Sequence, residues 1–210
     1  MADCCNDKAC EIEALRSRQS ATLKIVLGIN AVMFLVELTA GIMAGSVSLL
    51  ADSLDMLGDA LVYGFTLYVV ARGARMKAQA ALLKGGIMAA FGLFVLGQAD
   101  HRMFFPHVPV FEMIGAVGAL ALAANGLCLA LLWRHRADDI NMSSVWLCSR
   151  NDIIANVSVL FAAVGVWLTG SGWPDVVIGL ALAALFLKSA LYVLRSAGTE
   201  LRSVKSRTFV

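Results

Sequence analysis

Charged residues are scarce in this sequence. They make up 15 % of its 210 residues, while 60 % of the residues are apolar and the mean hydropathy is +0.78. Soluble domains usually contain about 25 % charged residues. The shortage of charge therefore excludes an ordinary soluble domain, and it predicts a lipid bilayer rather than nucleic acid as the partner of the chain.

The first 20 residues lack the apolar core of a cleavable signal peptide, and the rest of the chain lacks long polar stretches. A membrane-spanning helix needs about 20 apolar residues. The sequence therefore predicts an all-α integral membrane protein: a polar arm (1–20), a six-helix transmembrane domain (21–197) and a short basic tail (198–210). The six apolar stretches are roughly 21–45, 46–71, 78–99, 108–133, 143–169 and 173–195.

Basic residues are unevenly distributed among the segments that connect the predicted spans. The turns near 44–46 and 170–173 have none, and the 99–108 connection has only Arg102. Cytoplasmic segments are enriched in Lys and Arg. We therefore expect both termini on the cytoplasmic side of the inner (plasma) membrane. The basic residues on that side are Lys8, Arg16, Arg18, Arg72, Arg75, Lys77, Arg134, Arg136, Arg202, Lys205 and Arg207.

Three aspartates lie inside the second predicted span. A carboxylate deep in a bilayer costs several kcal/mol, so it is rarely accidental. Asp55 and Asp59 are spaced i, i+4 and share one helix face, and Asp52 lies one turn before Asp55. Lys188 is the only basic residue in the spans that we consider as their counter-charge, and its position favours snorkelling to the interface. Two close carboxylates therefore favour a bound cation.

The fifth predicted span repeats this spacing with Cys148 and Asp152. At about 1.5 Å per residue, both pairs fall near the middle of the bilayer. Two helices that each offer two ligands suit a tetrahedral ion such as zinc. The predicted metal ligands are Asp55, Asp59, Cys148 and Asp152, and the possible accessory residues are Asp52, Asn156 and Glu37.

Simpler interpretations of these polar residues stay open at this stage. Asp152 could pair with Arg150, and Glu37 could be either a proton relay or a paired carboxylate. Cys128 is expected to be a packing residue. We expect Asn30 and Asn125 to make hydrogen bonds between helices, as buried amides in membrane proteins do.

The polar arm contains three cysteines. Cys4, Cys5 and Cys10 are expected on the cytoplasmic side, where thiols stay reduced, so they do not predict a disulfide scaffold. Closely spaced thiols beside acidic residues could form a metal-capture arm. A disordered tail with incidental cysteines explains them equally well.

Two motifs resemble those of the cation diffusion facilitators, a family that includes zinc transporters. Residues 46–59 read SVSLLADSLDMLGD, similar to the family's SLALLADALHMLSD, and residues 148–160 read CSRNDIIANVSVL, similar to HxxxDxxxSxxVL. Asn125, Asn141 and the segment 173–175 also match. The resemblance covers about residues 22–197. It implies a divalent-metal exporter that exchanges metal for protons by alternating access, with no prosthetic group and no enzymatic activity.

The sequence departs from this family pattern in two respects. Asp55 and Cys148 replace the two histidines of the family motifs, and the three histidines present (His101, His107 and His135) are expected in loops. A thiolate favours Zn²⁺ or Cd²⁺, whereas carboxylates also admit Mn²⁺, Fe²⁺ or Co²⁺. The usual cytoplasmic ferredoxin-like domain is not expected after the sixth span, so a homodimer would form through the spans. A diaspartyl intramembrane hydrolase and a passive metal channel are the alternatives.

Overall fold

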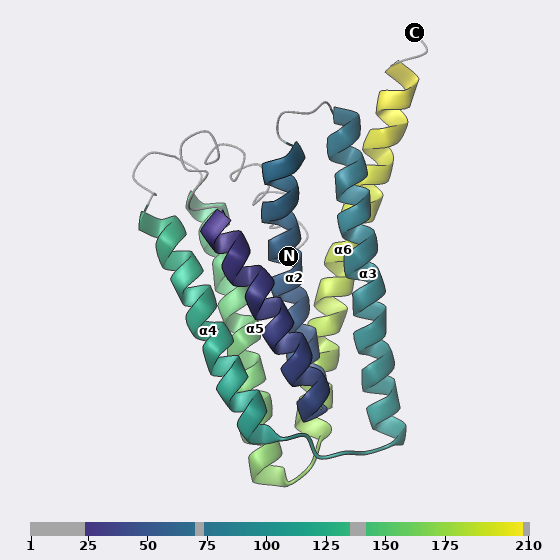
Figure 1. Ribbon diagram of the computed structural model, residues 1–210. Helices are drawn as coiled ribbons and strands as arrows, with labels where there is room; N and C mark the ends of the chain where they lie inside the picture. Colours follow the sequence, from purple (N-terminus) through teal and green to yellow (C-terminus); the bar gives the residue numbers. More distant parts are fainter. Residues whose placement is uncertain (1–23, 70–73, 135–141, 208–210) are drawn as a thin grey trace.

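The computed structural model describes residues 24–69, 74–134 and 142–207, and these ranges form six helices (Figure 1). Consecutive helices run in opposite directions through one bundle, so the Lys24 end of the first helix and the C-terminal end of the last lie on the same side. The polar arm with Cys4, Cys5 and Cys10 falls outside the described ranges. The helices are the N-terminal helix (Lys24–Ala44), α2 (Val47–Val69), α3 (Ala74–Phe104), α4 (Phe111–Arg134), α5 (Met142–Thr169) and α6 (Trp173–Arg207).

Five of these helices are long and apolar enough to cross a membrane. The exception is α2, which has 23 residues but carries three aspartates. Many large apolar side chains on the outside of the bundle are exposed, including Leu35, Phe161 and Leu168. The chain is therefore a multi-pass membrane protein, as the six apolar stretches predict.

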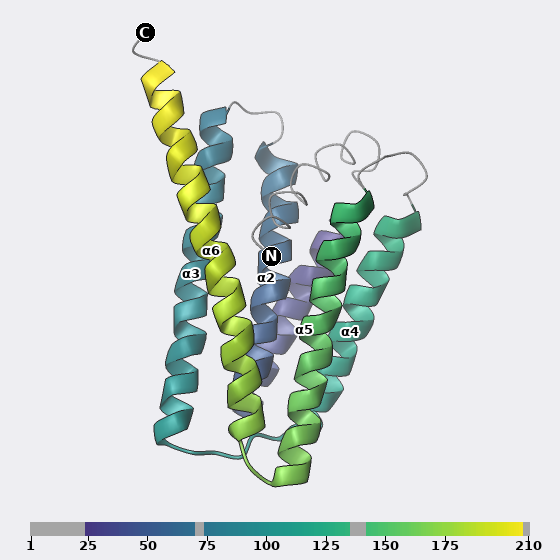
Figure 2. The same ribbon diagram turned by 180° about the vertical axis from the view of Figure 1, so that it is seen from behind.

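Helix α2 lies inside the bundle. It packs against α3, α5 and α6, while α3 pairs with α6 and α4 pairs with α5. The N-terminal helix covers α2 from another side, because Val26 packs against Val62 and Met33 packs against Met56. Figures 1 and 2 show α2 between these neighbours from opposite directions. The polar residues of α2 are therefore placed among other helices.

The turn between the N-terminal helix and α2 is fixed by backbone geometry. Gly45 has φ of 66°, a left-handed conformation that favours glycine. The Ser46 N–H donates to the Gly41 carbonyl (2.9 Å) and the Gly45 N–H donates to the Ile42 carbonyl (3.3 Å), which is the hydrogen-bond pattern of a Schellman motif. Helix α2 begins directly after this turn, so its first residues are held close to the end of the preceding helix.

Asp175 of α6 caps the first turn of α2. Its carboxylate accepts hydrogen bonds from the Val47 N–H (2.6 Å), the Ser48 N–H (3.1 Å) and the hydroxyls of Ser46 and Ser48. Ser46 in turn accepts a bond from the Leu49 N–H (3.1 Å), as an N-cap residue does. These bonds tie the start of α2 to the start of α6.

The contact continues one turn along α6. A Cβ atom at Gly179 would lie 2.7 Å from the Val47 carbonyl carbon and 2.8 Å from the Ser48 nitrogen. No other residue lets the two backbones approach this closely. The junction of α2 and α6 therefore combines a buried charged cap with direct backbone packing.

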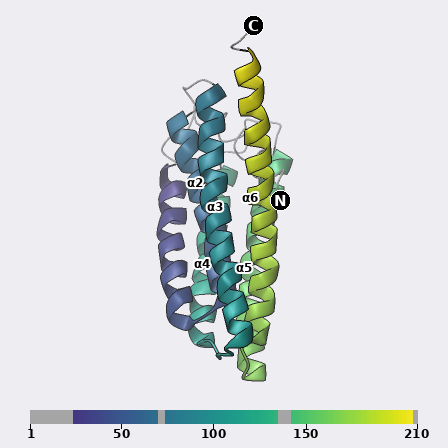
Figure 3. The ribbon, with the colours of Figure 1, turned by 90° about the vertical axis from the view of Figure 1, so that its right-hand side faces the viewer.

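Two helices extend beyond the limits that the apolar pattern predicts. Helix α3 continues to Phe104, so His101 is helical and not in a loop, and α6 continues to Arg207 instead of ending near 195 (Figure 3). The reason is that hydropathy marks the part of a helix that lies in the bilayer, whereas the helix itself can continue beyond the bilayer. Pro106 follows α3, and no proline follows within the described part of α6.

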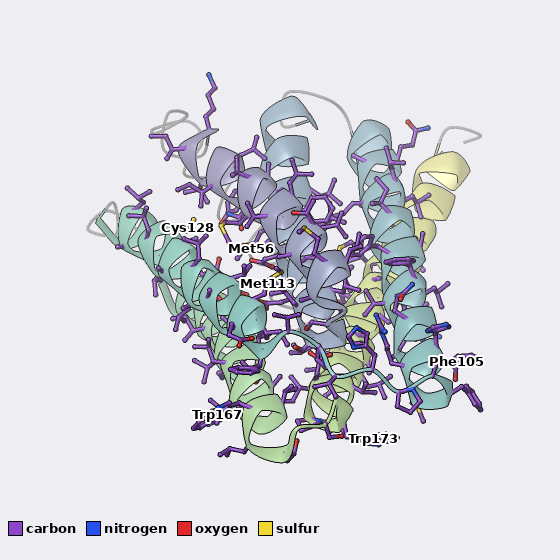
Figure 4. The ribbon with its side chains drawn as sticks, turned by 60° about the horizontal axis from the view of Figure 1, so that its bottom comes forward. Met56, Phe105, Met113, Cys128, Trp167 and Trp173 are labelled. Atoms are coloured by element: carbon purple, nitrogen blue, oxygen red, sulfur yellow. The ribbon has the colours of Figure 1, made fainter. Side chains whose placement is uncertain are left out.

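Aromatic side chains lie at the end of the bundle that holds the 104–111 and 169–173 connections. Trp167 and Trp173 are 62 % and 53 % exposed and project outward there, together with Phe105 (Figure 4). Tryptophans are enriched at membrane–water interfaces. Their position agrees with this enrichment, so this end of the bundle lies at a membrane–water interface.

Candidate metal site

The aspartates of α2 differ in their burial. Asp52 is completely buried, whereas Asp55 and Asp59 are half-buried. Met56, which lies among them in the sequence, is buried where α2 faces α4 and the N-terminal helix (Figure 4). Of the three carboxylates, that of Asp52 therefore lies deepest in the packed interior of the bundle.

Asp52 is held by a chain of two amides. The Asn156 amide nitrogen donates to both oxygens of Asp52, at 3.0 and 2.9 Å, and the Asn125 amide nitrogen donates to the Asn156 carbonyl oxygen at 2.9 Å. Asn156 is completely buried and Asn125 nearly so. The chain runs from α4 through α5 to α2, so it fixes the register of these three helices around the acidic residues. It also confirms the expected interhelical bond of Asn125.

Asp152 lies one turn before Asn156 on α5. It is half-buried, and its charge interacts with that of Asp52. Asp152 of α5 and Asp52 of α2 therefore lie in the same region of the bundle. The side chains of Cys148 and Arg150 lie outside the described residues, and so does Asn141.

The complete four-ligand site stays a prediction. Among the side chains that the structure describes, no three His, Cys, Asp or Glu residues lie close enough together to hold a metal ion. Cys148, the fourth predicted ligand, is not in that set. What the described residues establish is an acidic region between α2 and α5 that is positioned by Asn156.

Glu37 joins this acidic region from the N-terminal helix. It is completely buried, and its charge interacts with those of Asp52 and Asp55. Neither of its carboxyl oxygens has a hydrogen-bond partner within the described structure. The sequence left two interpretations of Glu37 open: a proton relay and a paired carboxylate. Among the described residues, its carboxylate is not paired through a hydrogen bond.

The remaining intramembrane amide and cysteine behave as expected. Asn30 donates to the Val26 carbonyl (2.9 Å) and, between helices, to the Cys128 sulfur (3.8 Å). Cys128 is buried in an apolar cluster with Val62 and Tyr63. This cysteine therefore has the packing role that its isolated position predicts.

Lys84 is a further basic residue within the predicted spans, which the sequence analysis did not consider. Lys188 was the only basic residue considered within the spans, and it is exposed on α6. Lys84 lies on α3 inside the predicted span 78–99, and it is only 7 % exposed. A buried lysine is usually paired, and Lys84 does make an interaction within the chain. The position of Lys84 inside the apolar stretch 78–99 was the feature of the sequence that indicated an intramembrane cation.

Removal of the Asn156 amide should destabilise the protein. In Asn156→Ala, the buried Asp52 carboxylate loses both hydrogen bonds and the Asn125 amide loses its acceptor, so we expect a loss of about 2–4 kcal/mol. Thermal unfolding of the purified protein in detergent measures this loss. Ser158→Ala is the control, because within the described residues that hydroxyl bonds to the Ile154 carbonyl of its own helix. Equal melting temperatures for the two variants would contradict a bracing role for Asn156.

Comparison with known proteins identifies related transporters. The family model described as "Cation efflux transmembrane domain" matches residues 23–202. The zinc transporter ZitB of Yersinia pestis is 25 % identical over 195 residues, which cover 87 % of this chain and 62 % of the relative. The metal cation efflux system protein CzcD of Cupriavidus metallidurans is 28 % identical over 194 residues, which cover 82 % of this chain and 61 % of the relative.

A third relative carries a name that mentions protons. The cadmium, cobalt and zinc/H(+)-K(+) antiporter of Bacillus subtilis is 24 % identical over 178 residues, covering 76 % of this chain and 56 % of the relative. The chain thus spans about 60 % of the length of the curated relatives it matches. The region that the family model matches, residues 23–202, covers five helices in full and most of α6, and it includes every residue of the acidic region.

Proposed function

Because this chain belongs to the cation efflux transmembrane domain family, the cation diffusion facilitators that its motifs resemble, we propose that it exports divalent metal ions in exchange for protons. Zn²⁺ is the first expected substrate and Cd²⁺ the second. The observation that carries the proposal is the acidic region inside the bundle, where a chain of buried amides holds Asp52 beside the predicted ligands. Relatives named as zinc and metal cation efflux proteins support it.

Four residues would bind the ion: Asp55 and Asp59 from α2, and Cys148 and Asp152 from α5. Asp52 and Asn156 would position these two helices, because their hydrogen bond joins α2 to α5 one turn from Asp55 and Asp152. Four ligands from two helices suit a tetrahedral ion. A relative movement of α2 and α5 would then open or close the site, which is what alternating access requires.

Proton exchange follows from the chemistry of the ligands. Carboxylates and a thiolate bind metal only when they are deprotonated, so metal binding releases protons. Several uncompensated negative charges inside a membrane are costly. We therefore expect the empty carrier to return with protons in place of the metal.

Transport by reconstituted protein tests the function. Zn²⁺ uptake into proteoliposomes, followed with an entrapped fluorescent indicator, should accelerate when a pH gradient is imposed and slow when an ionophore collapses it. A rate of Zn²⁺ uptake that does not depend on the pH gradient would instead indicate a passive channel. Absence of uptake for Zn²⁺, Cd²⁺, Co²⁺, Fe²⁺ and Mn²⁺ would refute the proposal and favour the alternative of a diaspartyl intramembrane hydrolase.

The thiolate should determine which metal is preferred. In Cys148→Ser, the site loses its only soft ligand, so the preference for Zn²⁺ and Cd²⁺ over Mn²⁺ and Co²⁺ should fall. We expect the ratio of transport efficiencies to fall by about tenfold, or ~1.4 kcal/mol of discrimination. Competition between these ions in proteoliposomes measures the ratio. Cys128→Ser, which changes a cysteine in an apolar cluster, is the matched control and should leave the ratio unchanged.

The proposal also includes the oligomeric state, the N-terminal cysteines and a second group of candidate metals. A homodimer through the transmembrane helices is expected, and no prosthetic group is required. For Cys4, Cys5 and Cys10, a metal-capture arm and a tail with incidental cysteines stay equal alternatives. Deletion of residues 1–10 tests the arm, since an unchanged apparent affinity for Zn²⁺ and Cd²⁺ would make it dispensable. An exporter of Mn²⁺, Fe²⁺ or Co²⁺ from the same family is the second candidate, because three of the four proposed ligands are carboxylates.

A further inference from the structure

The N-terminal helix buries oxygen atoms that lack hydrogen-bond donors. Three such side-chain atoms occur in the described part of the chain: the Asn30 carbonyl oxygen and both carboxyl oxygens of Glu37. All three belong to this one helix. A buried polar atom without a partner costs about 1–3 kcal/mol, and more when it is charged. Glu37 is therefore the most costly of these groups unless something binds to it.

The surroundings of Glu37 make this cost larger. Its charge interacts with those of Asp52 and Asp55, which are both acidic. Asp52 is also completely buried, and its hydrogen bonds come from Asn156 on α5, which leaves oxygen lone pairs free for another partner. Glu37 and Asp52 are thus two interacting, completely buried carboxylates on helices that pack together, and a cation bound by both would remove their repulsion.

This pair lies at a different depth from the main site. At about 1.5 Å per residue, Glu37 is ~10 Å from the Ala44 end of its helix, and Asp52 is ~8 Å from the Val47 end of α2. By the same measure, Asp59 is ~18 Å from that end. The pair is therefore nearer to the side of the 44–46 turn, which the distribution of basic residues predicts to be the outer side.

We propose that Glu37 and Asp52 form a second cation-binding position, which the transported ion occupies after it leaves the main site and before it reaches the outer face. Asp55 connects the two positions, since Glu37 interacts with it as well as with Asp52. The ligands are all oxygen atoms, which suit a divalent ion that keeps some of its water. This inference rests on the proposed function, because the ion is the exported metal.

Ion counting tests the second position directly. The parent protein carries Cys4→Ser, Cys5→Ser and Cys10→Ser, which removes thiol binding by the arm. Purified in detergent and dialysed against Zn²⁺, Glu37→Gln should bind one ion fewer per chain than the parent. Asp59→Asn should also bind one fewer, and the double variant should lose both ions. Glu112→Gln is the control, because this glutamate is exposed at the start of α4 and should keep the parent count.

Glu37→Asp provides a second route if Glu37→Gln does not fold. The shorter side chain keeps the charge but moves it away from Asp52, so one binding step should weaken while the other is unchanged. In proteoliposomes, Glu37→Gln should lower the maximal rate of Zn²⁺ transport by about tenfold, or ~1.4 kcal/mol of barrier. The KM for Zn²⁺ should stay within about twofold of the parent, because the initial binding site is intact.

The outcomes separate this inference from the proposed function. If Glu37→Gln binds as many ions as the parent while Asp59→Asn loses one, the second position is refuted and the main site stands; Glu37 is then a neutral, protonated side chain. If Glu37→Gln loses an ion while Asp59→Asn loses none, the main site is refuted and the second position stands. If Glu37→Gln and Asp59→Asn both bind as many ions as the parent, the main site and the second position are both refuted.

Discussion

Asp59→Asn is expected to abolish metal transport by the reconstituted protein. The amide has nearly the same shape as the carboxylate, so packing is preserved, but the negative charge that attracts the ion is lost. Loss of a residue that only supports a metal ligand typically costs 10- to 100-fold, so loss of a ligand should lower the rate by more than about 100-fold. Initial rates of Zn²⁺ uptake into proteoliposomes, with a fixed pH gradient, measure this effect.

Asp100→Asn is the matched control for this experiment. Asp100 is exposed on α3, so the same chemical change removes a charge that lies outside the acidic region. This variant should transport at nearly the parent rate. Asp152→Asn should behave like Asp59→Asn, because Asp152 is the carboxylate ligand that we propose on α5. Full transport by both Asp59→Asn and Asp152→Asn would show that the ion binds elsewhere.

The fold was predictable because the bilayer constrains it strongly. A spanning helix must be about 20 residues long and apolar, so its existence can be read from composition alone. The helix ends were less predictable, because the bilayer does not determine them. His101 illustrates this difference: it lies outside the apolar stretch 78–99 but inside α3, which continues until Phe104.

The candidate site was predictable along each helix but not between helices. The i, i+4 spacing places Asp55 with Asp59, and Cys148 with Asp152, on one helix face each. Spacing does not say which neighbour that face meets, because the rotation of each helix depends on packing across the whole bundle. The interaction of Glu37 with Asp52 is therefore visible only in the structure.

Asp175→Ala is expected to be the most destabilising of the substitutions considered. Asp175 is 1 % exposed, and it alone caps the first turn of α2 from another helix. Without the carboxylate, two backbone N–H groups and the hydroxyls of Ser46 and Ser48 lose an acceptor in a buried position. Loss of an N-cap costs about 0.5–2 kcal/mol, and each unsatisfied buried group adds about 1–3 kcal/mol. We expect a total of roughly 3–5 kcal/mol, since part of the loss is relieved by relaxation.

Thermal unfolding in detergent measures this effect, and Glu112→Ala is the matched control. Glu112 is also an acidic residue in the first turn of a transmembrane helix, but its side chain is exposed. Asp175→Asn should fall between the two variants, because the amide keeps one acceptor oxygen. If Asp175→Ala melts like Glu112→Ala, the cap contributes little, and close packing at Gly179 must hold α2 in place instead. If it melts much lower, the position of every acidic residue on α2 depends on a carboxylate that lies far from the metal site along the helix.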